Sequence, residues 1–309
     1  MSTFLVTGAA GFIGAAIAER LISEGNRVVT IDNLSTGFKE NIPAKVEFYQ
    51  GDCGDSDIYE KLPNYKFDAI FHIAGQSSGE ISYEDPIYDL KANTNSTLLL
   101  LQFALKRQCN RFIYASTMSV YGEQPEASIN EDAICKPESF YAVGKLASEH
   151  YLRLYEKDYG IKTTSLRLFN VYGPGQNLFN LKQGMASIYM AQLINKNSIH
   201  VKGSGNRFRD FVFIDDVVES FVRCLKYKDS YNEVINIGTG VKTSVRDLIS
   251  SLLIISNKKV PVKYSGNTLG DIHGIFADNE KCKSLLRLNK LTSINEGLTK
   301  MWLWANNLN

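Results

Sequence analysis

Tyr141 and Lys145 are four residues apart in the segment Ser-Phe-Tyr-Ala-Val-Gly-Lys, which spans 139–145. If this segment is helical, the two side chains lie on one face, about one turn apart. A free tyrosine has a pKa near ~10 and is a weak base at neutral pH, but a neighbouring ammonium group would stabilise the phenolate and lower its pKa. Such a pair can accept a proton from a hydroxyl while the adjacent carbon loses a hydride. The same spacing also occurs on ordinary solvated helices, so this chemistry requires a hydride acceptor bound elsewhere in the chain.

A glycine-rich segment near the start of the chain is a candidate site for that acceptor. Gly8, Gly11 and Gly14 follow an apolar stretch at 3–7 that predicts a buried strand, and apolar residues at helical spacing then continue to Gly25. A strand, a glycine loop and a helix in this order let backbone N–H groups approach a pyrophosphate at the helix N-terminus. The alternative is a tight turn without a ligand.

An acidic residue follows the second predicted strand, which spans 27–31. Asp32 lies 18 residues after Gly14, close to the ~20 residues expected for the carboxylate that binds the adenosine ribose. A carboxylate at this position would repel the 2′-phosphate of NADP, which favours NAD. The alternative is that Asp32 and Asn33 only form a turn.

Strand and helix signals alternate along the first half of the chain. Further strands are predicted at 46–49, 68–73, 111–116 and 161–169, with a helix at 97–105. This alternation predicts an α/β fold with a doubly wound parallel sheet, in which ligands bind at the carboxyl ends of the strands. Thr117 directly follows a predicted strand, so its hydroxyl would lie near the cofactor and Tyr141. Its alternative role is a local bond to the backbone.

Composition excludes several other classes of protein. The 309 residues suit one main domain with a smaller partner, and a formal net charge of +1 does not suggest a nucleic-acid partner. The five cysteines are scattered and form no C-x-x-C pair, so neither a disulfide framework nor a metal site is expected. No apolar run approaches the ~20 residues of a membrane span. We therefore expect a cytoplasmic protein with reduced thiols, no metal and no membrane partner.

The second half contains groups suited to a phosphorylated substrate. Gly-Pro-Gly at 173–175 predicts a loop leading into a substrate-binding part. Arg209 can bind a diphosphate through its planar guanidinium, or form a surface ion pair with Asp210. Spacing alone does not separate these roles. His72 comes just before a predicted strand end without an evident metal partner, so a structural role is expected for it.

Several of these motifs together resemble one superfamily. Gly8-x-x-Gly11-x-x-Gly14, Asp32, the segment 116–122 and Tyr141-x-x-x-Lys145 are similar to the extended short-chain dehydrogenases/reductases. Within it, the chain resembles the NAD-dependent nucleotide-sugar epimerases and dehydratases that are like UDP-glucose 4-epimerase. The resemblance implies an NAD-binding Rossmann domain at 1–168 plus about 211–237, and a smaller α/β nucleotide-sugar-binding domain at about 169–210 and 238–309.

The resemblance also implies roles for individual residues. The implied catalytic residues are Thr117, Tyr141 and Lys145. The implied NAD-binding residues are Gly8, Gly11, Phe12, Ile13, Gly14, Asp32, Asn33, Asp52, Cys53, Ala74, Gln76, Asn93, Tyr141 and Lys145. The implied substrate-binding residues are Gln76, Ser78, Thr117, Asn170, Val201 and Arg209. One departure is Thr268-Leu269 before Gly270-Asp271, where many relatives carry an arginine that reaches the diphosphate.

The resemblance narrows the reaction as well. The 4,6-dehydratases carry Asp-Glu after the threonine that matches Thr117, whereas this chain has Met118 and Ser119, which are neither acids nor bases near neutral pH. A 4-epimerase acting through a transient 4-keto sugar, in polysaccharide biosynthesis, is therefore implied. A nucleotide-sugar 4-dehydrogenase or 4-ketoreductase and a non-catalytic dinucleotide-binding sensor stay open as alternatives. A homodimer is implied through the helix of Tyr141 and the helix at 97–105, but the sugar and the nucleotide are not.

Overall fold

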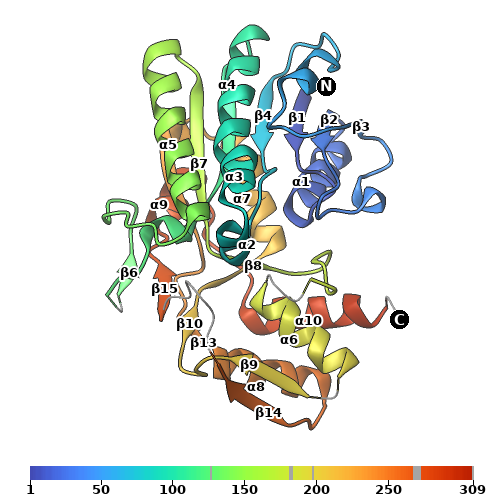
Figure 1. The fold of residues 1–309 in the computed structure, drawn as a ribbon, viewed down its shortest axis with the longest axis vertical. Coiled ribbons are helices and arrows are strands. Elements are labelled where there is room, and N and C mark those ends of the chain that lie inside the picture. Colours follow the sequence, from blue (N-terminus) through green and yellow to red (C-terminus); the bar gives the residue numbers. More distant parts are fainter. Residues whose placement is uncertain (126, 181–183, 197, 267–272, 308–309) are drawn as a thin grey trace.

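The computed structural model describes the whole chain except residues 126, 181–183, 197, 267–272 and 308–309. Its main feature is a parallel sheet with the strand order β12-β7-β5-β4-β1-β2-β3 (Figure 1). The strands of this sheet are β1 (Thr3–Thr7), β2 (Arg27–Asp32), β3 (Glu47–Gln50), β4 (Ala69–His72), β5 (Arg111–Thr117), β7 (Lys162–Leu168) and β12 (Glu233–Ile237). The predicted doubly wound parallel sheet is confirmed.

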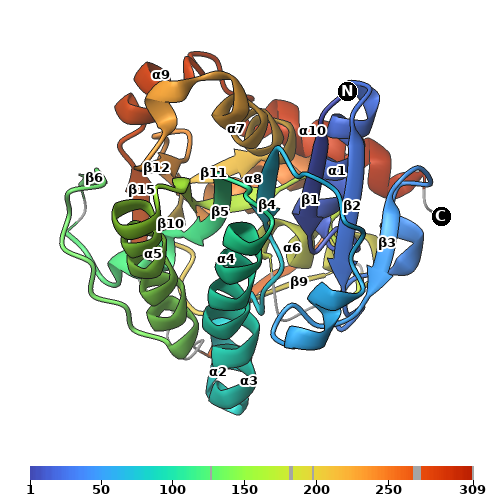
Figure 2. The ribbon, with the colours of Figure 1, turned by 90° about the horizontal axis from the view of Figure 1, so that it is seen from above.

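Helices cover both faces of this sheet (Figure 2). On one face, α1 (Phe12–Ser23) and α7 (Ile214–Lys226) share an apolar cluster with Val6 of β1. On the other face, α4 (Ser96–Lys106) and α5 (Phe140–Tyr159) share an apolar cluster with Leu5. Successive side chains of a strand point to opposite faces, so a strand covered on both sides is apolar at consecutive positions, as β1 is at Phe4, Leu5 and Val6.

The chain between β4 and α4 forms a short helical series beside α5. Its elements are α2 (Gly79–Glu84), α3 (Pro86–Leu90) and a π-helical turn (Lys91–Asn95) that continues into α4. The Asp85 side chain caps α3 by accepting a bond of 2.9 Å from the Tyr88 N–H. Widened helical turns of this kind often occur at functional sites, and this one buries Asn93.

The rest of the chain forms smaller sheets and helices. The strands are β6 (Ser128–Ile129), β8 (Asn170–Tyr172), β9 (Ile199–Lys202), β10 (Phe208–Arg209), β11 (Phe211–Phe213), β13 (Thr243–Ser244), β14 (Val262–Ser265) and β15 (Gly274–Ala277). The helices are α6 (Met185–Asn195), α8 (Val245–Ser256), α9 (Glu280–Leu286) and α10 (Ile294–Asn306). Short 3₁₀ turns lie at Lys39–Asn41, Ser56–Glu60, Met118–Tyr121 and Lys228–Ser230.

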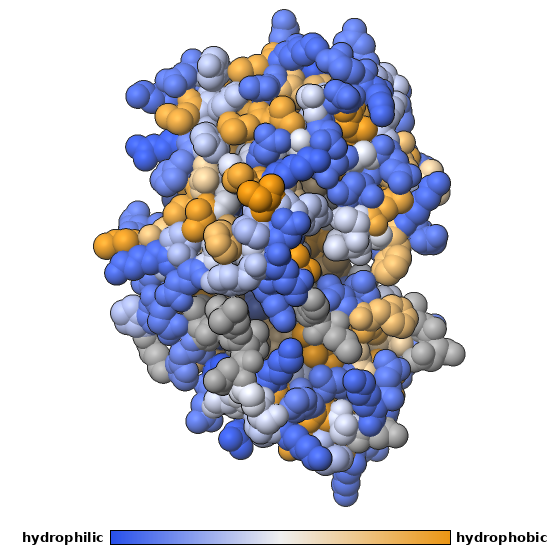
Figure 3. All heavy atoms as spheres, in the orientation of Figure 1, coloured by the Kyte–Doolittle hydropathy of each residue, from blue (hydrophilic) through white to orange (hydrophobic). Residues whose placement is uncertain are grey.

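The carboxyl ends of the main strands face part of these smaller elements. In Figure 1 strands β9 and β14 and helices α6, α8 and α10 lie below the main sheet. Figure 3 shows the surface hollowed between the upper and lower parts of the molecule. Across the described residues, the helices are either too short or too polar to cross a membrane.

Candidate active site

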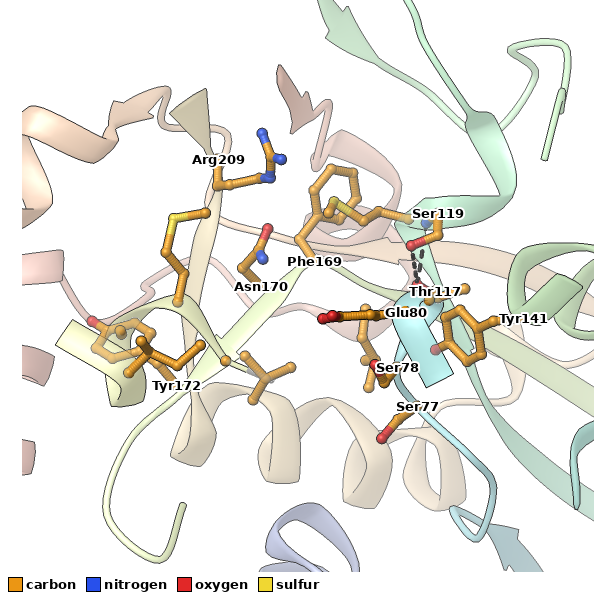
Figure 4. A pocket seen from close by; sticks show the side chains of 18 of the residues that line it. Ser77, Ser78, Glu80, Thr117, Ser119, Tyr141, Phe169, Asn170, Tyr172 and Arg209 are labelled. Atoms are coloured by element: carbon orange, nitrogen blue, oxygen red, sulfur yellow. Dashed lines mark hydrogen bonds between the residues drawn. The ribbon is translucent and has the colours of Figure 1, made fainter. Parts of the chain in front are cut away.

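The three residues proposed as catalytic come together in one cavity. Thr117 is the last residue of β5, while Tyr141 and Lys145 lie in the first turns of α5. Ser139 sets the start of α5, because its Oγ caps the helix by accepting a bond of 3.1 Å from the Ala142 N–H. All three residues line a cavity of about 770 Å³, and Figure 4 shows Thr117 and Tyr141 side by side within it.

Ser119 is a neighbour of Thr117 that the sequence analysis did not assign to the site. The Thr117 hydroxyl donates to Ser119 Oγ over 3.2 Å and accepts from the Ser119 N–H over 3.1 Å (Figure 4). These bonds fix the orientation of the hydroxyl. Met118 and Ser119 both line the cavity, so the positions that carry Asp-Glu in dehydratases face the site here without an acid or a base.

The pKa of Tyr141 differs from the expectation based on helical spacing. Burial raises the pKa of Tyr141 to about 12, the Thr117 hydroxyl acts in the opposite direction, and the charge of Asp89 raises it further. The Lys145 ammonium is 5.9 Å from the centre of the Tyr141 ring. In the protein without ligands, burial therefore dominates the pKa of Tyr141, and the lowering expected from Lys145 is not found.

Burial also destabilises the charged form of Lys145. Its Nζ donates to the Ala115 carbonyl over 3.0 Å and lies 4.9 Å from the centre of the Tyr114 ring. Burial lowers the pKa of Lys145 to about 8, although the carboxylates of Asp89 and Glu149 act to raise it. Lys145 thus changes charge within reach of physiological pH.

Asp89 is the centre of a buried polar network that the sequence analysis missed. Its Oδ1 accepts from Gln76 Nε2 over 2.7 Å and from Asn93 Nδ2 over 3.0 Å. Burial raises the pKa of Asp89. Asn93 Oδ1 is buried without a hydrogen-bond partner and would lie 2.5 Å from a Cβ placed on Gly75. The helical spacing of Asp89 and Asn93, four residues apart, was the available signal.

Gln76 and Asn93 are therefore part of this network. Within the described part of the chain, neither residue lines the cavity that contains Tyr141 or the smaller cavity beside the glycine-rich loop. Gln76 Nε2 also donates to the Ser78 carbonyl over 2.7 Å, which ties Ser78 and the start of α2 to this network. Ser78 itself lines the larger cavity.

A buried ion pair anchors α5 to the sheet. Arg167 donates to Glu149 through Nε over 3.0 Å and through Nη2 over 2.7 Å. The Ser116 hydroxyl donates to the same carboxylate. This bidentate pair joins α5 to β7 directly behind the strand end that carries Thr117.

A second cavity of about 240 Å³ adjoins the first, because Phe12, Ile13 and Gly75 line both. Most of the proposed NAD-binding residues line it: Gly8, Gly11, Phe12, Ile13, Gly14, Asp32, Asn33, Asp52, Cys53 and Ala74. A Cβ on Gly14 would lie 2.1 Å from the Gly8 carbonyl oxygen, so the loop and helix touch only because this position has no side chain. Such a cradle at a helix N-terminus fits a dinucleotide pyrophosphate.

The two acidic side chains of this cavity are held by backbone groups. Asp32 accepts from the Ala10 N–H over 2.9 Å and from the Leu34 N–H over 2.8 Å. Asp52 accepts from the Gly54 N–H over 2.7 Å. Each carboxylate oxygen has further lone pairs, so both can still bind hydroxyl or amino groups of a dinucleotide. The described residues contain no cluster of three or more His, Cys, Asp or Glu that could hold a metal ion.

Cationic side chains line the far side of the larger cavity. Arg209 is buried, donates to the carbonyls of Phe208 and His273, and has its pKa lowered to about 10 by burial. Figure 4 shows Arg209 and Asn170 on the side of the cavity opposite to Tyr141. Asp210 accepts bonds from Thr239, Gly240 and Ala277, so the alternative of an exposed Arg209–Asp210 pair does not describe this site.

Other residues on this side depart from the sequence-based assignment. Val201 is fully buried and does not line the described cavities, whereas its neighbours His200 and Lys202 do. Arg207 also lines the larger cavity. The alternation of side chains along β9 explains why the polar neighbours, and not Val201, reach the cavity. Thr268 and Leu269 lie outside the described residues, so the departure noted there has no structural account.

His72 is the last residue of β4 in the main sheet, and it lines neither cavity. Its ring nitrogens are 2.9 Å from the Thr7 hydroxyl and 3.1 Å from the Thr97 hydroxyl. Burial lowers the pKa of His72 to about 3. A neutral imidazole that joins β1 to α4 is a structural group.

Known proteins share both the sequence pattern and the fold. The chain is 34% identical to UDP-glucose 4-epimerase of Mycolicibacterium smegmatis, over 96% of each chain. A crystal structure of UDP-glucose 4-epimerase with UDP-glucose from Thermotoga maritima superposes with a TM-score of 0.95 at 33% identity, over 99% of both chains. The UDP-glucuronic acid 4-epimerase of Bacillus cereus, in complex with UDP-glucuronic acid and NAD, gives a TM-score of 0.91 at 30% identity, over 99% of this chain and 100% of that one.

Residues 4–238 match the family described as the NAD dependent epimerase/dehydratase family, a range that contains the glycine cradle, Thr117 and the Tyr141–Lys145 pair. The match covers more than half of the chain, and the identities above extend it to nearly the whole length. This protein belongs to the NAD-dependent epimerase/dehydratase family.

Proposed function

We propose that the protein is an NAD-dependent epimerase that inverts carbon 4 of a nucleotide-diphosphate sugar through a transient 4-keto sugar. The observation that carries the proposal is the position of Thr117 and Tyr141. They lie in a cavity whose far side presents Arg209 and which adjoins the glycine-lined cavity. A sugar held by its diphosphate at Arg209 would then reach the phenol.

NAD, when bound, supplies the acceptor and donor of the hydride at carbon 4. The phenol of Tyr141 is the group that exchanges a proton with the 4-hydroxyl, and Thr117 Oγ1 holds the same oxygen in place. Burial raises the pKa of Tyr141 to about 12 in the ligand-free protein, in which Lys145 is already beside it. The pKa must therefore fall when the ligands bind before the phenol can accept the proton.

The residues after Thr117 favour epimerisation over dehydration. Elimination of water across carbons 5 and 6 needs an acid and a base near those atoms, and Met118 and Ser119 provide neither. UDP-glucose, UDP-N-acetylglucosamine and UDP-glucuronic acid 4-epimerases are among the structural neighbours, which supports a UDP-hexose or its N-acetyl or uronic form as the substrate class.

The test is product analysis on purified protein without added cofactor. The protein is incubated with UDP-, GDP-, CDP- and dTDP-sugars, and the products are identified by NMR. We expect a mixture of 4-epimers to form while NAD stays bound. A requirement for stoichiometric external NAD would instead indicate a 4-dehydrogenase, and a requirement for NADH a 4-ketoreductase. Unchanged activity of Tyr141→Phe would contradict any catalytic proposal and favour a dinucleotide sensor.

The proposal extends to the organisation of the molecule. Residues 1–168 and about 211–237 would form the NAD-binding domain, and about 169–210 and 238–309 the nucleotide-sugar-binding domain. A cytoplasmic role in polysaccharide biosynthesis would follow from the product, an activated sugar. Deletion of the coding gene should then change the sugar composition of a cell-surface polymer.

A homodimer is part of the same proposal. Exposed apolar side chains on α3 and α5 support it: Ile87, Leu90, Phe140, Val143 and Leu154. Burial of such side chains between two copies would be favourable. Sedimentation should give about twice the mass of 34.6 kDa, and Leu154→Glu should halve it. A wild-type protein that sediments as a monomer would contradict this part of the proposal.

A further inference from the structure

The larger cavity has a basic side and an acidic side. The side chains of His200, Lys202, Arg207 and Arg209 line it from the region of β9 and β10. Glu80 of α2 and Glu138, just before α5, line it from the side of Tyr141. Cations suit the diphosphate of the proposed substrate, so the sugar of that substrate would lie on the acidic side of the cavity.

Glu80 is one of the two acidic residues on this side of the cavity. It is the second residue of α2 and half-buried, and Figure 4 shows its side chain pointing into the cavity. Within the described part of the chain, its carboxylate makes no ion pair. It is therefore available to a ligand.

The start of α2 holds Glu80 in this position. The Ser78 Oγ caps the helix by accepting from the Ile81 N–H over 3.3 Å. Gly79 packs against the start of α5, since a Cβ built on it would lie 3.9 Å from Ser139 Oγ. The rings of Tyr83 and Phe140 join the same two helices, with centroids 5.5 Å apart. Glu80 thus projects from a fixed element and not from a loose loop.

Cations do not neutralise Glu80 on this side of the cavity. Of the described residues that line it, Lys145 is the one cation on the side of Tyr141, and its Nζ is bonded to the Ala115 carbonyl. Glu138 and the buried Asp89 add negative charge around the same region. A second carboxylate brought in by a ligand would meet repulsion.

We propose that Glu80 restricts the substrate to nucleotide sugars whose hexose carries no negative charge, and so excludes uronic acids. This inference rests on the proposed nucleotide-sugar function. A glutamate carboxylate is anionic near neutral pH and can only accept hydrogen bonds. Hydroxyl groups of a neutral hexose donate to it, whereas the carboxylate of a uronate offers no proton and is repelled.

The test compares UDP-glucose with UDP-glucuronate on the NAD-loaded protein, by calorimetric Kd and by kcat/KM for 4-epimerisation. We expect the wild type to prefer UDP-glucose by about 100-fold in both quantities, as a like-charge contact in a partly buried site implies. Glu80→Gln keeps the size of the side chain and removes its charge. It should strengthen binding of UDP-glucuronate and reduce the preference to less than about 10-fold.

Glu84→Gln is the matched control, because Glu84 lies on the same helix, is exposed and does not line the cavity. It should keep the preference of the wild type. Equal use of both sugars by the wild type, or an unchanged preference in Glu80→Gln, would overturn this inference while leaving the epimerase proposal intact. If neither nucleotide sugar binds, both proposals are wrong for this cavity. Circular dichroism of each variant checks that the fold is retained.

Discussion

Lys145 is a buried lysine whose charge the fold destabilises, so its replacement tests how the site is built. Its side chain is 4% exposed, and its pKa falls from 10.5 to about 8 on folding because burial removes the ammonium from water. That difference corresponds to about 3 kcal/mol of lost stability at pH 7, where the lysine is protonated in both the folded and the unfolded chain.

The sign of the pH dependence follows from the two pKa values. Between pH 8 and 10.5 the folded protein releases the proton of Lys145 while the unfolded chain keeps it, so this contribution to stability rises with pH. The destabilisation should fall from about 3 kcal/mol at pH 7 to about 1.5 kcal/mol at pH 9.5. Titration of Tyr141 affects wild type and variant alike and cancels in their difference.

Lys145→Met removes the charge and keeps much of the side-chain volume. It also loses the bond to the Ala115 carbonyl, which costs about 1 kcal/mol. The cofactor-free variant should therefore be about 2 kcal/mol more stable than the wild type at pH 7, and the advantage should nearly vanish by pH 9.5. It should also be catalytically inactive, because the ammonium beside Tyr141 is gone.

The assay is urea unfolding of both cofactor-free proteins at pH 7, 8, 9 and 9.5. Lys106→Met is the control, since Lys106 is exposed on α4 and paired with Glu60, so its replacement should not stabilise the protein at pH 7. If Lys145→Met is less stable than the wild type at pH 7, or if the difference between them does not change with pH, the reasoning about burial is refuted. The carboxylates of Asp89 and Glu149 would then hold the lysine charged throughout.

Three further predictions concern the cofactor cradle, the substrate side and the α5 anchor. Gly14→Ala places a Cβ 2.1 Å from the Gly8 carbonyl oxygen, so the protein should lose its bound NAD and about 1–3 kcal/mol of stability. The NAD content is measured by absorbance after denaturation, and retention of NAD would contradict the proposal that this loop binds the pyrophosphate. Arg209→Ala should raise KM for the nucleotide sugar by about 100-fold or more while the NAD content stays that of the wild type; an unchanged KM would show that the diphosphate binds elsewhere. Glu149→Gln leaves Arg167 charged, buried and without its carboxylate, so urea unfolding should show a loss of about 3 kcal/mol, and a loss below about 1 kcal/mol would show that water reaches the guanidinium.

Local pattern was sufficient for much of the cofactor side. The glycine spacing and Asp32 belong to one strand–loop–helix–strand unit, and all four residues line the smaller cavity of the structure. Thr117 was placed by the rule that parallel strands present their carboxyl ends to ligands. The pair Tyr141 and Lys145 followed from helical spacing alone.

The site residues that local sequence pattern did not predict are brought to the cavity by contacts between distant segments. Val201 was assigned to the substrate side, but the pleat of β9 turns His200 and Lys202 to the cavity instead. Glu80 lies near the site because α2 packs on the start of α5, a contact between elements about 60 residues apart along the chain.

The amino-acid sequence by itself determined the parallel α/β fold and the glycine cradle and supplied the candidate reacting groups, because each depends on residue types at short, regular spacings. Only the tertiary structure decided the protonation of those groups. Burial raises the pKa of Tyr141 to about 12 and lowers that of Lys145 to about 8. Desolvation depends on everything packed around a group, including Asp89 and Glu149 from other positions in the chain, and no local spacing encodes it.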